Sequence, residues 1–210
     1  MARLVVFGCS FTVGVGLPDV YPRYYPRHDI PSNMGWPSLL GEKLGLEVVN
    51  QGIGGAGNLE IFHKILKTDF QPDDLCIILW SSFLRHDQFV METEFGEGKR
   101  IGHGIFVKDT DVTDINWANN NRNKNWLTIH HTSCYLKYLG VNFYSLLGIV
   151  NGEDITGYRP TNLDIPNFID EIRPGHWIVD EALDGAPGRP GHPGVESQRL
   201  LSQMIYDRIV

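Results

Sequence analysis

Residues 3–7 have the sequence RLVVF, and a glycine, a cysteine and a serine (GCS, residues 8–10) follow at once. A short, continuous apolar run is typical of a β-strand that is buried on both faces of a parallel sheet. The pattern returns in LCIILW over residues 75–80, which predicts a central strand. Together the two runs favour an α/β fold.

Strands and helices alternate along much of the remaining chain. Shorter apolar runs predict further strands over residues 46–49 and 141–147. Apolar side chains at helical spacing predict helices over residues 36–44, 59–67, 126–139 and 197–209. Such alternation is typical of a sheet covered by helices on both faces. We therefore expect one domain over residues 1–210, a three-layer α/β/α sandwich with a mainly parallel central sheet.

Two stretches do not follow this alternation. Residues 81–125 are polar, end in WANNNRNKN and exceed the ~15 residues of an ordinary loop. Residues 159–193 are rich in proline and predict an extended, loop-rich return to the sheet. Long loops on a compact α/β core commonly carry function. We expect residues 81–125 to be a loop-rich insertion after the third strand that contacts the substrate as a cap.

The composition excludes several classes of protein. With 18 basic and 25 acidic side chains the formal net charge is −7, which argues against nucleic-acid binding. No apolar run approaches the ~20 residues that span a bilayer, and the start MARLVVFG lacks the features of a signal peptide. Three widely spaced cysteines favour neither a disulfide framework nor a metal site. We expect a cytoplasmic protein without nucleic-acid or membrane partners; its oligomeric state is not indicated.

Two residues suit nucleophilic catalysis at the carboxyl ends of the strands, where open parallel sheets bind ligands. Ser10 directly follows the first strand; alone, it is better explained as a helix cap. His192 adjoins Pro193, a residue suited to the first position of the last helix. An imidazole is the usual general base for a serine because its pKa lies near neutral pH. The pair predicts a nucleophile and its base.

Four stretches, in this order, resemble the sequence blocks of the SGNH or GDSL-like hydrolases. LVVFGCSFTVG (residues 4–14) is similar to the first block, with GCS where GDS is usual. GWPSLLGEKLGLEVVNQGIGGAGN (residues 35–58) is similar to the helix, strand and second block that follow. LCIILWSS (residues 75–82) is similar to the strand before the third block, and GHPG (residues 191–194) to the fifth. The resemblance implies an SGNH-type fold and a serine esterase that needs no cofactor and no metal.

The resemblance also implies roles for single residues. Ser10 matches the nucleophile, whose N–H also serves the oxyanion hole, and His192 matches the base. Gly55 matches the second-block glycine, whose N–H is another oxyanion donor. Each fixed donor at the developing oxyanion is worth ~3–4 kcal/mol of barrier.

The third block departs from the family pattern. Its asparagine, a further oxyanion donor, is missing from WSSFLRHD (residues 80–87). Ser82 is the first candidate to replace it, with Asn58 and Arg85 as alternatives. Loss of one donor costs about 100-fold or more in rate.

The acid that orients the histidine is also displaced. The family has an aspartate three residues before the histidine, where this chain has Arg189. Asp184 is the nearest upstream acid, and Asp180 is a poorer candidate. A backbone carbonyl is a further alternative for orienting His192.

The insertion has side chains that suit a carbohydrate. Trp117 and Trp126 offer aromatic faces, residues 119–121 are amides, and Arg85 is a candidate contact for the substrate. Sugar rings stack on aromatic faces, and their hydroxyls need hydrogen-bond partners. The same aromatic residues would equally form a small core of the insertion itself. We expect an ester substrate, a small molecule or a saccharide, with an O-acetyl sugar as the first to test.

Two other functions compete with the esterase. Without the third-block asparagine and the usual acid, the fold could serve as a catalytically weak or inactive carbohydrate-binding or structural module. Residues 52–57 (GIGGAG) also satisfy GxGxxG between a strand and a helix, a pattern of dinucleotide binding. That pattern expects an acid at the end of the next strand, where this chain has Trp80 and Ser81.

Overall fold

The computed structural model describes most of the chain, with main chain only at 85–86, 105–106 and 115–119; the described residues are 2–20, 30–83, 85–86, 105–106, 115–148, 165–169, 184–188 and 191–210. Four strands form one sheet in the order β2-β1-β3-β6, and each neighbouring pair is parallel. The strands are β1 (Arg3–Gly8), β2 (Glu47–Asn50), β3 (Leu75–Trp80) and β6 (Asn142–Leu147). The two apolar runs of the sequence are thus the two inner strands.

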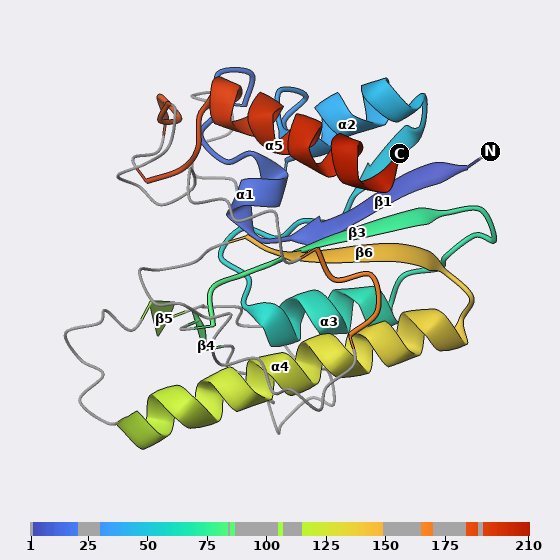
Figure 1. Cartoon of the computed structure of the whole chain (residues 1–210). Coiled ribbons are helices and arrows are strands. Elements are labelled where there is room, and N and C mark those ends of the chain that lie inside the picture. Colours follow the sequence, from blue (N-terminus) through green and yellow to red (C-terminus); the bar gives the residue numbers. More distant parts are fainter. Residues whose placement is uncertain are drawn as a thin grey trace, which may run out of the picture.

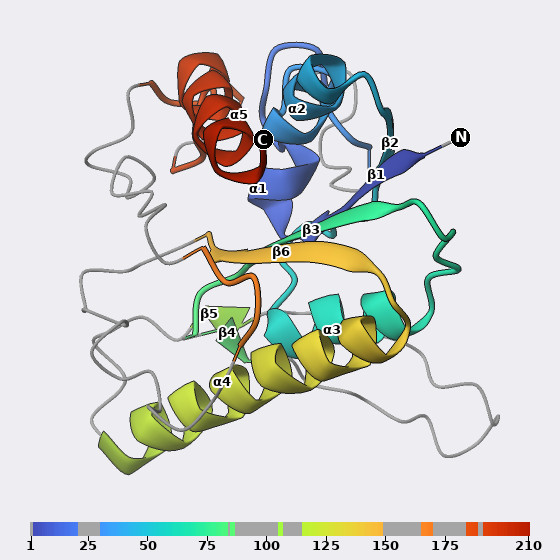
Figure 2. The same ribbon diagram turned by 45° about the vertical axis from the view of Figure 1, so that its right-hand side comes forward.

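Helices cover both faces of the sheet (Figure 1). On one face lie the short α1 (Ser10–Val13), α2 (Trp36–Leu44) and α5 (Val195–Ile209). On the other lie α3 (Asn58–Leu66) and the long α4 (Ile115–Tyr138), and the turned view of Figure 2 shows the same separation. The three-layer α/β/α fold predicted from the sequence is confirmed.

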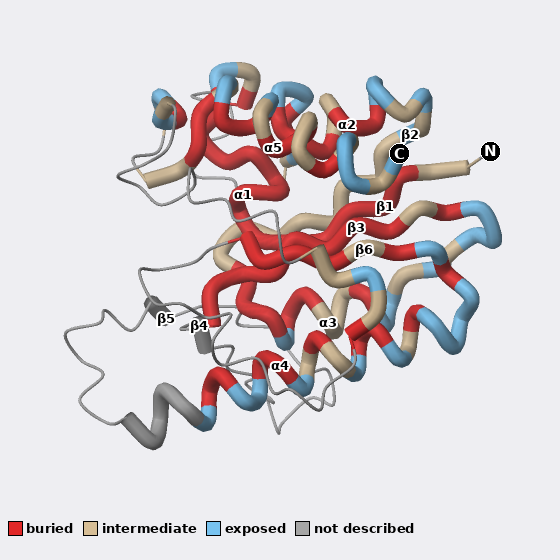
Figure 3. Tube along the Cα trace, in the orientation of Figure 1, coloured by how far each residue is buried: buried red, intermediate tan, exposed pale blue. Residues whose placement is uncertain are grey.

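The core is centred on β1 and β3, which are buried throughout except at their first residues (Figure 3). Leu4, Val5, Val6 and Phe7 are 0% exposed, as are all residues from 76 to 80. Burying one such large apolar side chain contributes ~1.5–3 kcal/mol, so the inner strands supply much of the driving force for folding.

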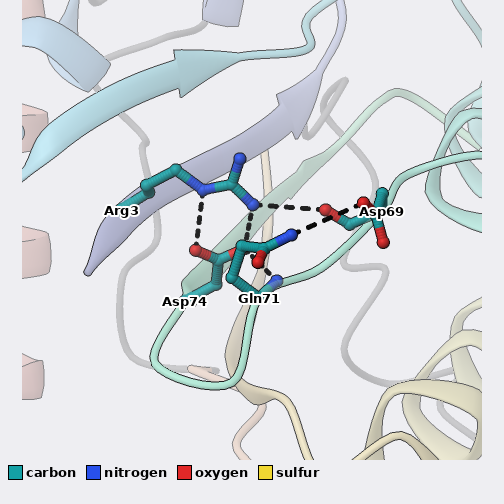
Figure 4. Close-up of polar contacts among 4 residues, drawn as sticks. All are labelled: Arg3, Asp69, Gln71 and Asp74. Atoms are coloured by element: carbon teal, nitrogen blue, oxygen red, sulfur yellow. Dashed lines mark hydrogen bonds and ion pairs between the residues drawn. The ribbon is translucent and has the colours of Figure 1, made fainter. Parts of the chain in front are cut away.

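An ion pair joins the amino ends of the two inner strands (Figure 4). Arg3 donates from Nε to Asp74 Oδ1 (2.9 Å) and from Nη2 to Asp74 Oδ2 (2.6 Å). The Gln71 N–H donates to the same Oδ2 (2.8 Å), and Arg3 Nη2 also reaches the Asp69 carbonyl (3.2 Å). The hydrogen-bonded Arg3 guanidinium lowers the pKa of the Asp74 carboxyl.

The carboxyl ends of β1 and β3 lie side by side, because Gly8 is in register with Leu79. A Cβ on Gly8 would lie 2.1 Å from Thr12 Oγ1 and 2.8 Å from the Leu79 carbonyl oxygen. Only glycine therefore lets α1 fold back over the end of the sheet. This close packing sets the place of Ser10, the first residue of α1.

The elements differ from the sequence prediction in two places. α4 begins at Ile115 instead of residue 126, so the last part of the expected insertion is helical. Its buried residues there include Asn121, Arg122 and Asn125, and a polar buried face has no apolar periodicity to reveal it. α5 begins at Val195, and Pro193 precedes its N-cap Gly194 instead of occupying the first helical position.

Parts of the two long irregular stretches lie within the described residues. In the insertion, β4 (Arg85–His86) and β5 (Ile105–Phe106) form an antiparallel pair. Residues 167–169 run beside β6: the Ser145 N–H donates to the Asn167 carbonyl (3.1 Å) and the Ile169 N–H to the Ser145 carbonyl (2.8 Å). Across the described ranges, no helix combines the length and apolar character that crossing a membrane requires.

Candidate active site

Ser10 and His192 meet although 182 positions separate them in the chain. The Ser10 Oγ and the His192 Nε2 are 2.9 Å apart, a hydrogen-bond distance. Ser10 is 5% exposed, so the hydroxyl is largely shielded. The geometry is that of a hydroxyl with a base in reach of its proton.

The turn after β1 explains the position of Ser10. Cys9 is the extended N-cap residue of α1, and Gly14 ends the helix in the left-handed region at φ 79°. The Gly14 N–H donates to the Ser10 carbonyl (3.0 Å), which closes a single turn. Because Cys9 holds the cap position and the Ser10 hydroxyl contacts His192, Ser10 is not the cap of this helix.

His192 is held by a short antiparallel pairing between residues 184–186 and 192–194. The Ala186 N–H donates to the His192 carbonyl (2.8 Å), and the Gly194 N–H donates to the Asp184 carbonyl (2.9 Å). The imidazole also packs edge to face against Phe11, with ring centroids 5.1 Å apart. Main-chain pairing and ring packing therefore fix both the segment and the ring.

The N-cap residue of α5, Gly194, has no side chain, and the Asp184 carboxylate caps the helix instead. Its Oδ1 accepts from the Ser197 N–H and the Ser197 hydroxyl (both 2.9 Å), and its Oδ2 accepts from the Glu196 N–H (3.0 Å). A Cβ on Gly194 would lie 2.3 Å from Asp184 Oδ2, so the cap requires glycine there. Among the hydrogen bonds of the described residues, those of the Asp184 carboxylate run to the start of α5 and none runs to the imidazole. The role of Asp184 in orienting His192 stays a prediction.

The loop that carries Gly55 is bound to the end of β1. The Ile53 N–H donates to the Gly8 carbonyl (2.9 Å), and Asn50 Nδ2 donates to the Thr12 carbonyl (2.8 Å). Gly55 has φ 80°, which favours glycine. Among the hydrogen bonds of the described residues, none is donated by the Gly55 N–H or the Ser10 N–H. The same loop is the GxGxxG stretch at residues 52–57.

Asn58 is committed to the protein interior. Its Nδ2 donates to the Ser81 carbonyl (3.2 Å) and to Asn125 Oδ1 (2.7 Å), and its Oδ1 accepts from the Ser81 N–H (2.7 Å). Both amide hydrogens are thus used, which leaves none for an oxyanion. Ser82 is 1% exposed and directly follows the residue that Asn58 binds. Asn125 is a residue of this cluster that sequence patterns did not predict, although its spacing of four from Asn121 indicates one helix face.

The expected substrate contacts lie elsewhere or outside the described side chains. Trp126 is 1% exposed, and its ring packs against Phe83 and Phe168 with centroids 5.1 and 5.7 Å away. It is a core residue here and presents no face to a substrate. Trp117 lies in α4 and Arg85 in β4, but their side chains are outside the described set, as are Asp180 and Arg189.

Comparisons with known proteins show a likeness of fold. No protein-family model and no curated protein matches the chain. An acetyl xylan esterase from the rumen bacterium Butyrivibrio proteoclasticus is 13% identical, with a TM-score of 0.58 over 99% of this chain and 63% of that one. A carbohydrate esterase whose active site displays divergent catalytic and non-catalytic binding functions is 13% identical, with a TM-score of 0.56 over 99% and 68%.

A third solved structure is a lipolytic protein assigned to the G-D-S-L family, from Desulfitobacterium hafniense. It is 14% identical, with a TM-score of 0.48 over 99% of both chains. The chain spans about two thirds of the length of the two carbohydrate esterases, 63% and 68%.

Proposed function

We propose that the protein is a serine esterase of the SGNH type, which hydrolyses a carboxylic ester through an acyl-enzyme. The observation that carries the proposal is the 2.9 Å contact between Ser10 Oγ and His192 Nε2 at the carboxyl end of β1. The likeness of fold to two carbohydrate esterases supports it. The resemblance of the sequence blocks is independent support.

In the first half-reaction Ser10 attacks the ester. As the bond forms between Oγ and the carbonyl carbon, the hydroxyl proton passes to His192 Nε2. The carbonyl oxygen takes the negative charge. The carbonyl then re-forms, the bond to the alcohol oxygen breaks, and the imidazolium gives its proton to the departing alcohol. Ser10 is left acylated and His192 neutral.

In the second half-reaction water removes the acyl group. His192 takes a proton from the water as its oxygen attacks the acyl carbon, and returns it to Ser10 Oγ as that bond breaks. The products are a carboxylic acid and the original enzyme. Both halves need the same base at the same distance, so one histidine serves twice.

The N–H groups of Ser10 and Gly55 stabilise the oxyanion in both halves. None of the hydrogen bonds of the described residues is donated by either group, and the Gly55 loop is fixed to β1 by the bond from Ile53 to Gly8. Donors held before the reaction need no reorganisation as charge develops. Ser82, buried after β3, is the candidate third donor in place of the absent asparagine.

Asp184 acts on His192 through the main chain. It caps α5 and pairs with the segment that carries the histidine, so it sets the position of the ring without touching it. Ser10 and His192 are then the reacting pair, and Asp184 is a positioning residue.

An O-acetyl group on a carbohydrate is the proposed substrate. The names of the two similar esterases support this class of substrate. The test is acetate release from p-nitrophenyl acetate and from an acetylated xylo-oligosaccharide. Ser10→Ala should lower kcat by about 10³-fold or more, as removal of a nucleophile does. A fluorophosphonate should label wild-type Ser10 and leave the variant unlabelled.

Ser145→Ala is the matched control. Ser145 is a fully buried serine on β6, and its hydroxyl has no hydrogen-bond partner among the described residues. This variant should keep the wild-type rate. A wild-type rate in Ser10→Ala would overturn the esterase proposal and favour a binding module.

A further inference from the structure

We infer that Asn58 and Asn125 are positioning residues, which hold residues 81–83 in place beside the oxyanion site. The inference rests on the proposed function. It concerns the third-block position, where this chain lacks the asparagine donor that its sequence resemblance would supply.

Three amide side chains form the cluster: Asn58 at the start of α3, and Asn121 and Asn125 one turn apart on α4. Asn58 binds both the N–H and the carbonyl of Ser81. Asn125 Nδ2 donates to the Phe83 carbonyl (3.2 Å) and to the Asn121 carbonyl (2.8 Å). Asn121 Nδ2 donates to the Phe83 carbonyl as well. Residues 81–83 are therefore bound at both ends.

The cluster is buried and satisfied. Asn58 is 1% exposed, and Asn121 and Asn125 are each 7% exposed. Buried amides are costly unless they are hydrogen-bonded, and apolar side chains would fill the same space without that cost. Asn58 and Asn125 each donate both amide hydrogens, and the bond from Asn58 Nδ2 to Asn125 Oδ1 joins them. A fully satisfied network of this kind fixes one arrangement of the segment that it binds.

Residues 81–83 lie near the candidate active site, so their rigidity bears on catalysis. Residues 81–83 follow β3, whose carboxyl end lies beside that of β1 and hence beside the turn of Ser10. Asn58 itself comes three positions after Gly55, so one side chain links the loop of one oxyanion donor to the segment that carries Ser82. The edge-to-face packing of Phe83 on Trp126 supports the same segment from α4.

A donor must be held within about 0.5 Å of its working position to stabilise a transition state. With the third-block asparagine absent, Ser82 is the candidate donor, and the cluster binds the main chain of the residues on either side of it. Loss of the cluster should therefore weaken binding of the transition state more than binding of the ester. The expected signature is a lower kcat with a nearly constant KM.

The test compares three single variants in the full chain. Asn58→Ala and Asn125→Ala should lower kcat for p-nitrophenyl acetate by about 10- to 100-fold, as misplacement of a catalytic group by ~1 Å does. KM should stay within about twofold. Thr132→Ala is the matched control: Thr132 is buried on α4, and its hydroxyl donates to the Thr128 carbonyl (2.8 Å). Its kcat should stay at the wild-type value, whatever its melting temperature.

A second measurement does not depend on activity. Hydrogen exchange in peptides that cover residues 81–83 should be at least about tenfold faster in Asn58→Ala and Asn125→Ala than in wild type or Thr132→Ala. The Ser81 amide should respond most to the change at Asn58, because it donates to that side chain. Should Asn58→Ala fail to fold, Asn58→Ser retains one hydroxyl partner for Ser81 and takes its place.

The two proposals fail in different ways. A wild-type rate in Ser10→Ala overturns the esterase proposal. Hydrogen exchange at residues 81–83 then still tests whether the cluster immobilises this segment. Equal exchange at residues 81–83 in all variants overturns the inference, as does a fall in kcat that Thr132→Ala matches at the same loss of stability.

Discussion

The carboxylate of Asp184 accepts three hydrogen bonds from the start of α5 and none from the imidazole. Its two possible roles respond differently to amidation. In a triad, an amide in place of the aspartate favours the wrong histidine tautomer and lowers kcat by ~10⁴. As a helix cap, asparagine is nearly as good as aspartate. The substitution Asp184→Asn therefore distinguishes the triad role of this residue from its role as a helix cap.

Asp184→Asn should lower kcat/KM by less than about tenfold, because its Oδ1 still accepts from Ser197 and the imidazole loses no partner. Asp184→Ala removes the cap and should lower the free energy of unfolding by ~0.5–2 kcal/mol. Steady-state kinetics and urea titration of both variants measure these effects. A thousandfold loss of kcat in a fully stable Asp184→Asn would assign the aspartate to direct orientation of His192.

Sequence patterns predicted which residues come together but not every partner of each residue. Ser10 and His192 were predictable because each adjoins a recognisable boundary, a strand end and the start of the last helix. The bonds of Asp184 were not, since they depend on how two short segments pair. The same holds for Asn58. Its position after a glycine-rich loop is visible in the sequence, but its bonds to Ser81 and Asn125 depend on the tertiary structure.

Among the elements, apolar patterning was informative wherever the buried face is apolar. β1, β3, α2 and α3 lie within two residues of their predicted bounds. The start of α4 was missed because its inward face carries Asn121, Asn125 and Arg122, which are polar and nevertheless buried. Composition alone does not distinguish such a face from a polar loop.

The ion pair of Arg3 and Asp74 joins the amino ends of β1 and β3. Asp74→Asn should lower the free energy of unfolding by ~1–2 kcal/mol near neutral pH, because Arg3 loses its charged acceptor. The loss is small because the Arg3 side chain is partly exposed to solvent, which screens the ion pair. Urea titration of wild type and variant measures the difference.

The sign of its pH dependence follows from the lowered pKa of Asp74 in the folded protein. Below an unfolded pKa of ~3.9 the unfolded state binds more protons than the folded state, so stability rises with pH there. The stability difference between wild type and Asp74→Asn should be constant above about pH 5 and shrink as the pH falls through 4. A difference that grows on acidification would contradict the proposed pairing.

At the scale of the whole molecule, the fold brings the turn after β1, near the start of the sequence, beside α5, near its end. β1 is an inner strand, and α5 packs beside α2 on the face where Ser10 emerges (Figure 1). Gln198 of α5 accepts from the Trp36 N–H (2.8 Å) and donates to the Phe11 carbonyl (3.4 Å). The sequence predicted that Ser10 meets His192, from the strand end before Ser10 and the helix start after His192; the hydrogen bonds of Gln198 are features of the folded chain.

The meeting of Ser10 and His192 should therefore be lost together with the fold. Leu201 and Ile205 of α5 belong to the same buried cluster as residues of β1 and β3. We therefore expect α5 to unfold together with the sheet. In a urea titration, the rate of Ser10 labelling by a fluorophosphonate should fall at the same midpoint as the far-ultraviolet circular dichroism. In Asp184→Ala, where the cap of α5 is missing, labelling should fall at a lower urea concentration than the circular dichroism. Separate midpoints in wild type would show that the His192 segment opens independently, and the dyad would then depend on a local structure instead of on the whole core.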